Sequence, residues 1–177
     1  SLCSNKTEDT PMSDSKRVYH EVIKPLKRAL KGQPQHRVAT LALIISSLVR
    51  GSNAQLSRIA AKSPSEAKNT STVTRISRWL DNKNVDCETF YAPFASSILS
   101  ALSRSTIYLA MDASSTARGL QTLMFGVIYK KRLLPLCWVT YKGIKGHKSS
   151  QFHIEALQKL LEVVPKETNA ILLADAE

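Results

Sequence analysis

The sequence predicts an α+β protein, with an all-helical region over residues 16–104 and a mixed α/β region over residues 105–177. Two observations predict this division. Before residue 105, apolar residues recur at the three- and four-residue spacing of amphipathic helices. After it, short runs rich in β-branched and aromatic residues surround one helical segment, in the order strand, strand, strand, helix, strand. Residues 1–15 are polar and rich in Ser, Thr and Asp, and we expect them to be a disordered tail.

Five helices are expected in the first region. The first contains Pro25, which kinks or restarts a helix. The fourth carries an apolar stripe that ends at Leu80, and Ser71 or Thr72 is placed to cap it. The expected ranges are 16–31, 36–50, 54–61, 72–81 and 87–103.

Three strands, a helix and a fourth strand are expected in the second region. Lys130, Lys131 and Arg132 join the second and third strands tightly enough for a hairpin. Pro135 in the third strand indicates an edge position or a bulge. The expected strands are 106–112, 121–129, 133–141 and 170–175, and the expected helix is 151–164.

The chain is strongly basic, with 25 Lys and Arg against 14 Asp and Glu, a net charge of +11. Residues 1–104 hold 16 of the basic and 8 of the acidic residues. An excess of this size is typical of nucleic-acid binding, and a generically basic soluble protein is the alternative. The three scattered cysteines do not form a disulfide framework, which indicates a reducing compartment. The longest apolar stretch, 38–49, is well short of the ~20 residues that span a bilayer, so we expect a cytoplasmic protein with no membrane partner.

Two carboxylates each end an apolar run, Asp112 after IYLAM and Asp175 after AILLA. A buried carboxylate is costly unless it is paired, hydrogen-bonded or bound to a cation. If the two strands lie side by side and parallel, the carboxylates meet at one sheet edge, because paired strands run about 4.8 Å apart. That arrangement suits Mg²⁺ or Mn²⁺ in two-metal phosphoryl transfer. The alternative is a pair of ordinary turn residues, since Asp is common at strand ends.

The predicted order of strands and helix is that of the first elements of an RNase H-like fold. The sequence of these elements also resembles a known family. The segment MDASSTARGLQTLMFGVIYKKRLLPLCWVTYKGIKGHKSS, followed by ILLADAE, resembles the DDE-type transposases of bacterial cut-and-paste insertion sequences. In that family the first Asp ends the first core strand, as Asp112 does, and the second ends the fourth strand, as Asp175 does. The stretch RISRWLDN (75–82) resembles the helical amino-terminal region of the family. The resemblance covers roughly residues 36–177.

The resemblance implies a DNA transposase that uses Mg²⁺ or Mn²⁺ to cleave DNA and transfer strands at insertion-sequence ends, with Asp112 and Asp175 as catalytic metal ligands. The metal-bound carboxylates activate water to hydrolyse one strand, and the freed 3′-hydroxyl attacks a target phosphodiester. The implied partners are double-stranded DNA of the element ends and of the target, which places the protein at the nucleoid. A homodimer on DNA is left open.

The third carboxylate of the family is a Glu on a helix farther downstream, and this chain ends before that helix. The expectation is therefore a truncated RNase H-like core, inactive by itself. Two alternatives stay open: a non-catalytic DNA-binding remnant of a truncated transposase, and an RNase H-like nuclease unrelated to transposition.

Candidate DNA-binding residues lie on the fourth helix, in the hairpin turn and in the basic loop 143–150. Helices 54–61 and 72–81 are candidates for a helix-turn-helix, although its usual turn has 3–4 residues and the segment 62–71 has ten. Phosphate contact by the arginines of the fourth helix is the milder interpretation, and a solvated helix face is the alternative. The candidates are Arg75, Arg78, Lys130, Lys131, Arg132, Lys145 and Lys148.

Overall fold

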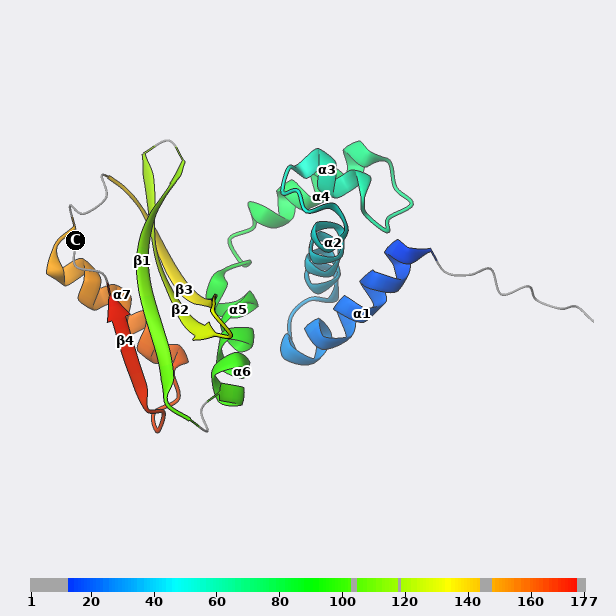
Figure 1. Ribbon diagram of the computed structural model, residues 1–177. Coiled ribbons are helices and arrows are strands. Elements are labelled where there is room, and N and C mark those ends of the chain that lie inside the picture. The colour runs from blue at the N-terminus through cyan, green and yellow to red at the C-terminus, as the bar shows by residue number, and fades with distance from the viewer. Residues whose placement is uncertain (1–12, 103–104, 118, 144–147, 175–177) are drawn as a thin grey trace, which may run out of the picture. The chain divides into compact units, whose positions relative to one another are not determined.

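The computed structural model describes residues 13–102, 105–117, 119–143 and 148–174, which form seven helices and one four-stranded mixed sheet (Figure 1). The α+β class expected from the sequence is confirmed. The chain divides by packing into two compact units, here called the helical unit, up to Val85, and the sheet unit, from Asp86. The tail expected to be disordered lies outside the described residues up to residue 12, but Asp14 already belongs to the first helix.

The helical unit contains helices α1 (Asp14–Ala29), α2 (Gln35–Gly51), α3 (Leu56–Ala61) and α4 (Asn69–Leu80). Leu43, Ile59 and Ile76, one each from α2, α3 and α4, form a buried cluster and are at most 4% exposed. Pro25 lies inside α1, which continues past it. These four helices confirm the order predicted for this part of the chain.

Helix α4 differs from its predicted boundaries and apolar face. It begins at Asn69, so Thr72 lies within the helix, where it is 2% exposed, instead of capping it. Leu80 is 55% exposed, so the prediction that it faces the core is wrong. The buried stripe is displaced toward the start of the helix because α4 packs against α2 and α3 through Ile76, and Thr72, one turn earlier, is also buried.

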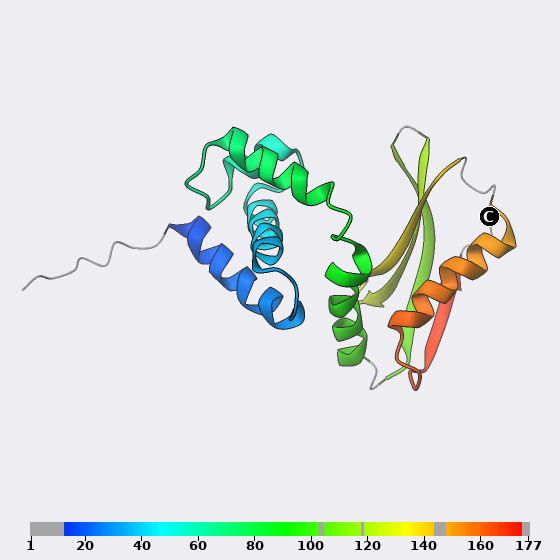
Figure 2. The same ribbon diagram turned by 180° about the vertical axis from the view of Figure 1, so that it is seen from behind.

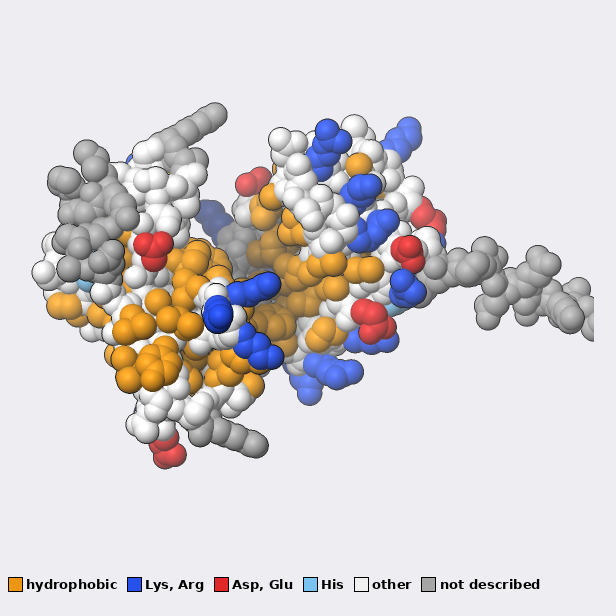
Figure 3. Space-filling view, in the orientation of Figure 1, with side chains coloured by type: hydrophobic (Ala, Val, Ile, Leu, Met, Phe, Trp, Pro, Cys, Tyr) orange, Lys and Arg blue, Asp and Glu red, His pale blue; other side chains and the backbone are white. Residues whose placement is uncertain are grey.

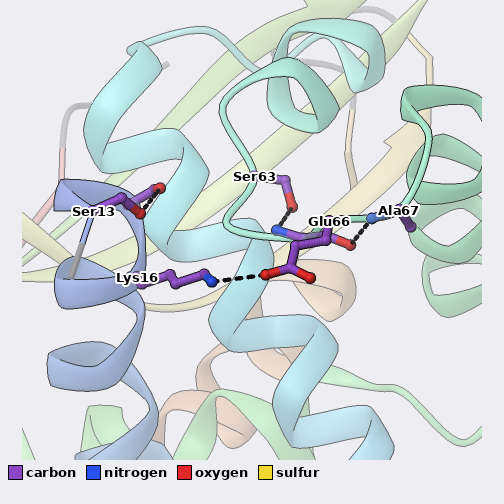
Figure 4. A network of polar contacts seen from close by, with 7 residues as sticks. Ser13, Lys16, Ser63, Glu66 and Ala67 are labelled. Carbon is purple, nitrogen blue, oxygen red and sulfur yellow. Dashed lines mark hydrogen bonds and ion pairs between the residues drawn. The ribbon is translucent and has the colours of Figure 1, made fainter. Parts of the chain in front are cut away.

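The segment between α3 and α4 is held by its own turns (Figure 4). The Ser63 hydroxyl accepts a hydrogen bond from the Ser65 amide at 3.0 Å, and the Ser65 hydroxyl accepts one from the Ala67 amide at 3.2 Å. Lys16 of α1 donates to Glu66 at 2.7 Å, and this bond holds the pKa of the Glu66 carboxyl below its usual range. The connection therefore runs longer than the 3–4-residue turn of a helix-turn-helix and is anchored to α1.

The sheet unit is built on strands β1 (Ile107–Ala117), β2 (Leu120–Tyr129), β3 (Arg132–Lys142) and β4 (Ala170–Ala174), in the order β3-β2-β1-β4. The pairs β1–β2 and β2–β3 are antiparallel, whereas β1–β4 is parallel. Helix α7 (Ser150–Val163) connects β3 to β4. The predicted strand-strand-strand-helix-strand order is confirmed, and so is the expected side-by-side, parallel placement of the first and last strands.

Strand β1 is longer than predicted. It continues past Asp112 to Ala117, because β2 pairs with it up to Ala117↔Leu120, with a shift of register between Ser115 and Ala117. Asp112 therefore lies inside an antiparallel pair on one side, and on the other side the last described pair with β4, Met111↔Ala174, stands next to it.

Two further helices, α5 (Cys87–Phe90) and α6 (Ala92–Leu102), belong to the sheet unit, where α6 and α7 share one face of the sheet (Figure 2). Ala95 and Leu99 of α6 and Leu160 of α7 are buried in one core with Phe125 of β2. The sequence places the boundary between the two regions after residue 104, whereas the packing places it at Val85, since the apolar face of α6 is buried against the sheet.

A bulge in β3 confirms the interpretation of Pro135. Gly126 of β2 pairs with Pro135 and the preceding Phe125 pairs with Cys137, so Leu136 is an extra residue and is 1% exposed. A Cβ atom on Gly126 would lie 2.6 Å from the Leu133 Cγ and 2.8 Å from the Leu134 carbonyl oxygen. Only a glycine leaves β3 room to approach at this point.

We predict that Gly126→Ala lowers the free energy of unfolding of the sheet unit by about 1–3 kcal/mol, the usual cost of overpacking. Amide hydrogen exchange in β2 and β3 measures this loss locally. Gly51→Ala is the control, because its new methyl group would meet only the flexible Lys62 side chain, at 3.3 Å. Equal protection in the two variants would show that the β2–β3 contact is looser than described.

Candidate functional site

Asp112 lies on the face of the sheet opposite α6 and α7. Ile107 and Leu109 of β1 are each 4% exposed and belong to the core, so strand alternation turns Tyr108, Ala110 and Asp112 the other way. The Asp112 side chain is exposed, and the Ser114 hydroxyl donates to its Oδ2 at 3.1 Å. The carboxylate is thus oriented by one neighbour and keeps oxygen lone pairs for a ligand.

The parallel pair β1–β4 leads directly to the two predicted site residues. Its register runs from Ile107↔Ala170 to Met111↔Ala174, and in the sequence the next residue on each strand is an aspartate. Asp175 lies outside the described residues, so the structure places Asp112 but not the second carboxylate.

Apolar side chains are exposed on the same face of the sheet as Asp112. Tyr108 is 48% exposed, and its neighbours on β4, Ile171 and Leu173, are 45% and 47% exposed. Figure 3 shows hydrophobic side chains gathered over β1 and β4. Every residue of β4 is exposed, so this strand is held mainly by its pairing with β1.

The predicted basic hairpin turn is present, and its backbone is unusual. Tyr129 pairs with Arg132, which leaves Lys130 and Lys131 as a two-residue turn with φ of 46° and 64°. A two-residue turn with two positive φ angles normally selects Asn-Gly. Two lysines are unfavourable here, and residues kept in such conformations gather at functional sites.

The basic loop after β3 is described only at its two ends, at Gly143 and from Lys148 onward. Lys145 lies outside the described residues. Lys148 places its ammonium 4.6 Å from the ring centroid of Tyr141 and 5.3 Å from that of Phe152. This cation–π contact positions the lysine beside Ser149, whose hydroxyl accepts from the Phe152 amide and caps α7.

Arg75 and Arg78 line a cavity of about 590 Å³ between α4 and α2. The Arg75 Nε donates to the Thr40 hydroxyl at 2.9 Å, and the Trp79 indole donates to the Arg37 carbonyl at 2.9 Å. The sequence reasoning missed Arg37, Thr40 and Trp79 as members of this site. Arg37 and Thr40 are three residues apart on α2, and Trp79 follows Arg75 by four residues on α4. This helical spacing would have grouped them only if the packing of α2 against α4 had been known.

Searches for a metal cluster, for a membrane-spanning helix and for similar proteins give no further indication of function. Within the described residues, no three His, Cys, Asp or Glu side chains gather as a metal site. In that same part of the chain, no helix has both the length and the apolar character needed to cross a membrane. Comparisons with family models, curated proteins and solved structures found no match. Function is therefore inferred from the residues and their geometry.

We predict that the double variant Lys130→Asn, Lys131→Gly makes the sheet unit about 1 kcal/mol more stable, because it relieves the positive-φ strain. If the two lysines contact DNA phosphates, the same variant lowers the slope of log affinity against log salt by up to about 1.8. Thermal unfolding and a salt titration of duplex-DNA binding measure the two effects. The control, Lys159→Gln with Lys166→Gln, removes the same charge elsewhere in the unit, and an equal loss of slope there would assign no special role to the turn.

Proposed function

We propose that this chain is a DNA-processing protein of the DDE transposase type, in which Asp112 and Asp175 belong to a metal-dependent site that cleaves and joins DNA strands. The observation that carries the proposal is the parallel β1–β4 register, whose last described pair, Met111↔Ala174, stands one residue before an aspartate on each strand. One more step of that register would set the two carboxylates on neighbouring strands, about 4.8 Å apart in backbone spacing.

The sheet topology supports an RNase H-like core. The order β3-β2-β1-β4, with two antiparallel pairs, a connecting α7 and a final parallel pair, is the one expected for the opening of that fold. Because β1 and β4 are paired in parallel, both apolar runs point the same way, and the residue that follows each run would come to one edge of the sheet.

The surroundings of Asp112 fit a divalent cation with a preference for oxygen ligands. Its carboxylate is exposed and accepts one hydrogen bond, from Ser114, which leaves further lone pairs open. Asp112 and Asp175 would hold Mg²⁺ or Mn²⁺, and Ser114 would fix the orientation of the Asp112 Oδ2. The bound metal would supply a water of lowered pKa and neutralise charge on a phosphodiester.

The charge distribution supports double-stranded DNA as the partner. The helical unit, residues 1–85, carries 15 basic and 6 acidic residues, whereas residues 86–177 carry 10 and 8. Lys and Arg side chains are spread over the face of the helical unit that Figure 3 shows. Such a cationic surface binds phosphate backbones through counterion release.

A second candidate function is DNA binding without catalysis. It is favoured by the same charge distribution, since most of the positive charge belongs to the unit that does not contain Asp112. Metal binding at Asp112 and DNA binding by the helical unit are separate measurements, so the two candidates can be distinguished.

For the metal site, we predict that Mn²⁺ selectively broadens the NMR signals of residues around Asp112 and that Asp112→Asn abolishes this broadening. Asparagine keeps the shape of the side chain and the acceptor for Ser114 but removes the charge that attracts the cation. Asp81→Asn, a change at an exposed aspartate of the helical unit, is the control and should leave the effect intact. Undiminished broadening in Asp112→Asn would contradict the catalytic proposal and favour the second candidate.

For DNA, we predict that the affinity for duplex DNA falls steeply with salt and that Arg75→Ala with Arg78→Ala lowers the slope by about 2, one for each lost phosphate contact. Fluorescence anisotropy with a labelled duplex at several salt concentrations measures this. Lys27→Ala with Arg28→Ala, on α1, removes the same charge away from α4. An affinity that did not depend on salt would contradict both candidate functions.

A further inference from the structure

Among the residues that the structure describes, the cavity between α2 and α4 is lined mainly by arginines and hydroxyl groups and by no acidic side chain. Arg37 comes from α2, Arg75 and Arg78 come from α4, and Ser71 and Thr74 lie at the start of the same wall. Three guanidinium groups around about 590 Å³ make a strongly positive site. Like charges repel one another, so an arrangement of this kind favours an anionic ligand.

None of the three arginines is neutralised by a carboxylate in the described part of the chain, where the ion pairs join Lys16, Arg17 and Lys24 to their partners. Arg75 is nevertheless held in place. Its Nε donates to Thr40, whose hydroxyl in turn donates to the His36 carbonyl at 2.8 Å. One edge of the guanidinium is thus used for positioning, while its terminal nitrogens keep their hydrogens for a ligand.

Arg37 also has a guanidinium hydrogen that no acceptor among the described residues uses. Its Nε is buried and has no hydrogen-bond partner. Buried donors without an acceptor are uncommon in proteins, and each one requires an explanation. The Arg37 backbone is fixed, because its carbonyl accepts the Trp79 indole N–H at 2.9 Å. Arg37 also lines the cavity, where a ligand with several acceptor oxygens would pair with its guanidinium group.

We infer that this cavity, here called the arginine pocket, binds a phosphate group. Planar guanidinium groups match phosphate oxygens with paired hydrogen bonds, which a lone chloride ion cannot accept in the same way. The volume of about 590 Å³ lies within the range of about 300–1,000 Å³ for ligand sites and has room for a phosphate ester. The inference rests on the proposed function in one respect only. If the protein binds DNA as proposed, the phosphate in the pocket belongs to the DNA backbone. A free phosphate ester is the other source of the same chemistry.

The test follows the indole N–H NMR signal of Trp79 in the full chain during titration with inorganic phosphate, with chloride at equal ionic strength as reference. A saturable shift with phosphate alone is expected. Ser71→Asp adds a carboxylate to the pocket wall at an exposed position in the first turn of α4, where an acidic residue also stabilises a helix. It should weaken phosphate binding about tenfold, and Arg37→Gln should do the same.

The matched control is Thr70→Asp, which adds the same charge one residue earlier, at an exposed position that does not line the pocket. It should change the affinity much less. Absence of a saturable shift, or equal effects of Ser71→Asp and Thr70→Asp, would overturn the inference. Because Ser71→Asp is not expected to disturb folding, a loss of binding in that variant cannot be attributed to unfolding.

A second arm identifies the source of the phosphate. If duplex DNA competes with inorganic phosphate for the Trp79 signal, the DNA backbone occupies the pocket. If phosphate binds and duplex DNA leaves that signal unchanged, the DNA source is overturned and a free phosphate ester is supported. Asp112→Asn separates this inference from the proposed catalysis, because it should leave phosphate binding unchanged whatever its effect on metal binding.

Discussion

The parallel pairing of β1 with β4 is the constraint on which the sheet unit depends. Two parallel strands cannot be joined by a tight turn, so the chain must cross back over the sheet, and α7 makes that crossing. The crossing helix can do so only because Ala156 and Leu160 are buried against the sheet. The same pairing brings the carboxyl ends of two apolar runs to one edge, so the topology that forms the core also positions Asp112.

Local patterns in the sequence predicted the elements well where a strong signal existed. Pro135 correctly indicated a bulge, and Lys130 with Lys131 correctly indicated a tight hairpin. The failures came from packing that local patterns do not contain. Leu80 fits a helical stripe but is exposed, because the burial of α4 is set by α2 and α3. The extension of β1 past Asp112 required the partner strand β2 to be known.

The candidate sites, too, were predicted only as far as local sequence patterns allow. The two aspartates were found because each follows an apolar run, although only Asp112 lies within the described residues. Arg75 and Arg78 were found as the polar face of one helix, but Arg37 was missed, since its partners lie on a helix about forty residues away in the sequence. A site built across two helices needs the tertiary arrangement, and the orphaned Arg37 Nε becomes visible only there.

The exposure of β4 has a consequence for the order of folding. Its five residues are all exposed, and its pairing with β1 closes a chain loop from Ile107 to Ala170. Closing such a long loop costs chain entropy before the β1–β4 contacts can form. The β1–β2 and β2–β3 hairpins join residues that are near in the sequence, so their loop-closure cost is smaller. We therefore expect the hairpins to form early and β4 to dock last and open first. A cation shared by Asp112 and Asp175 would bind only the docked strand, so metal binding would be coupled to the final step of folding.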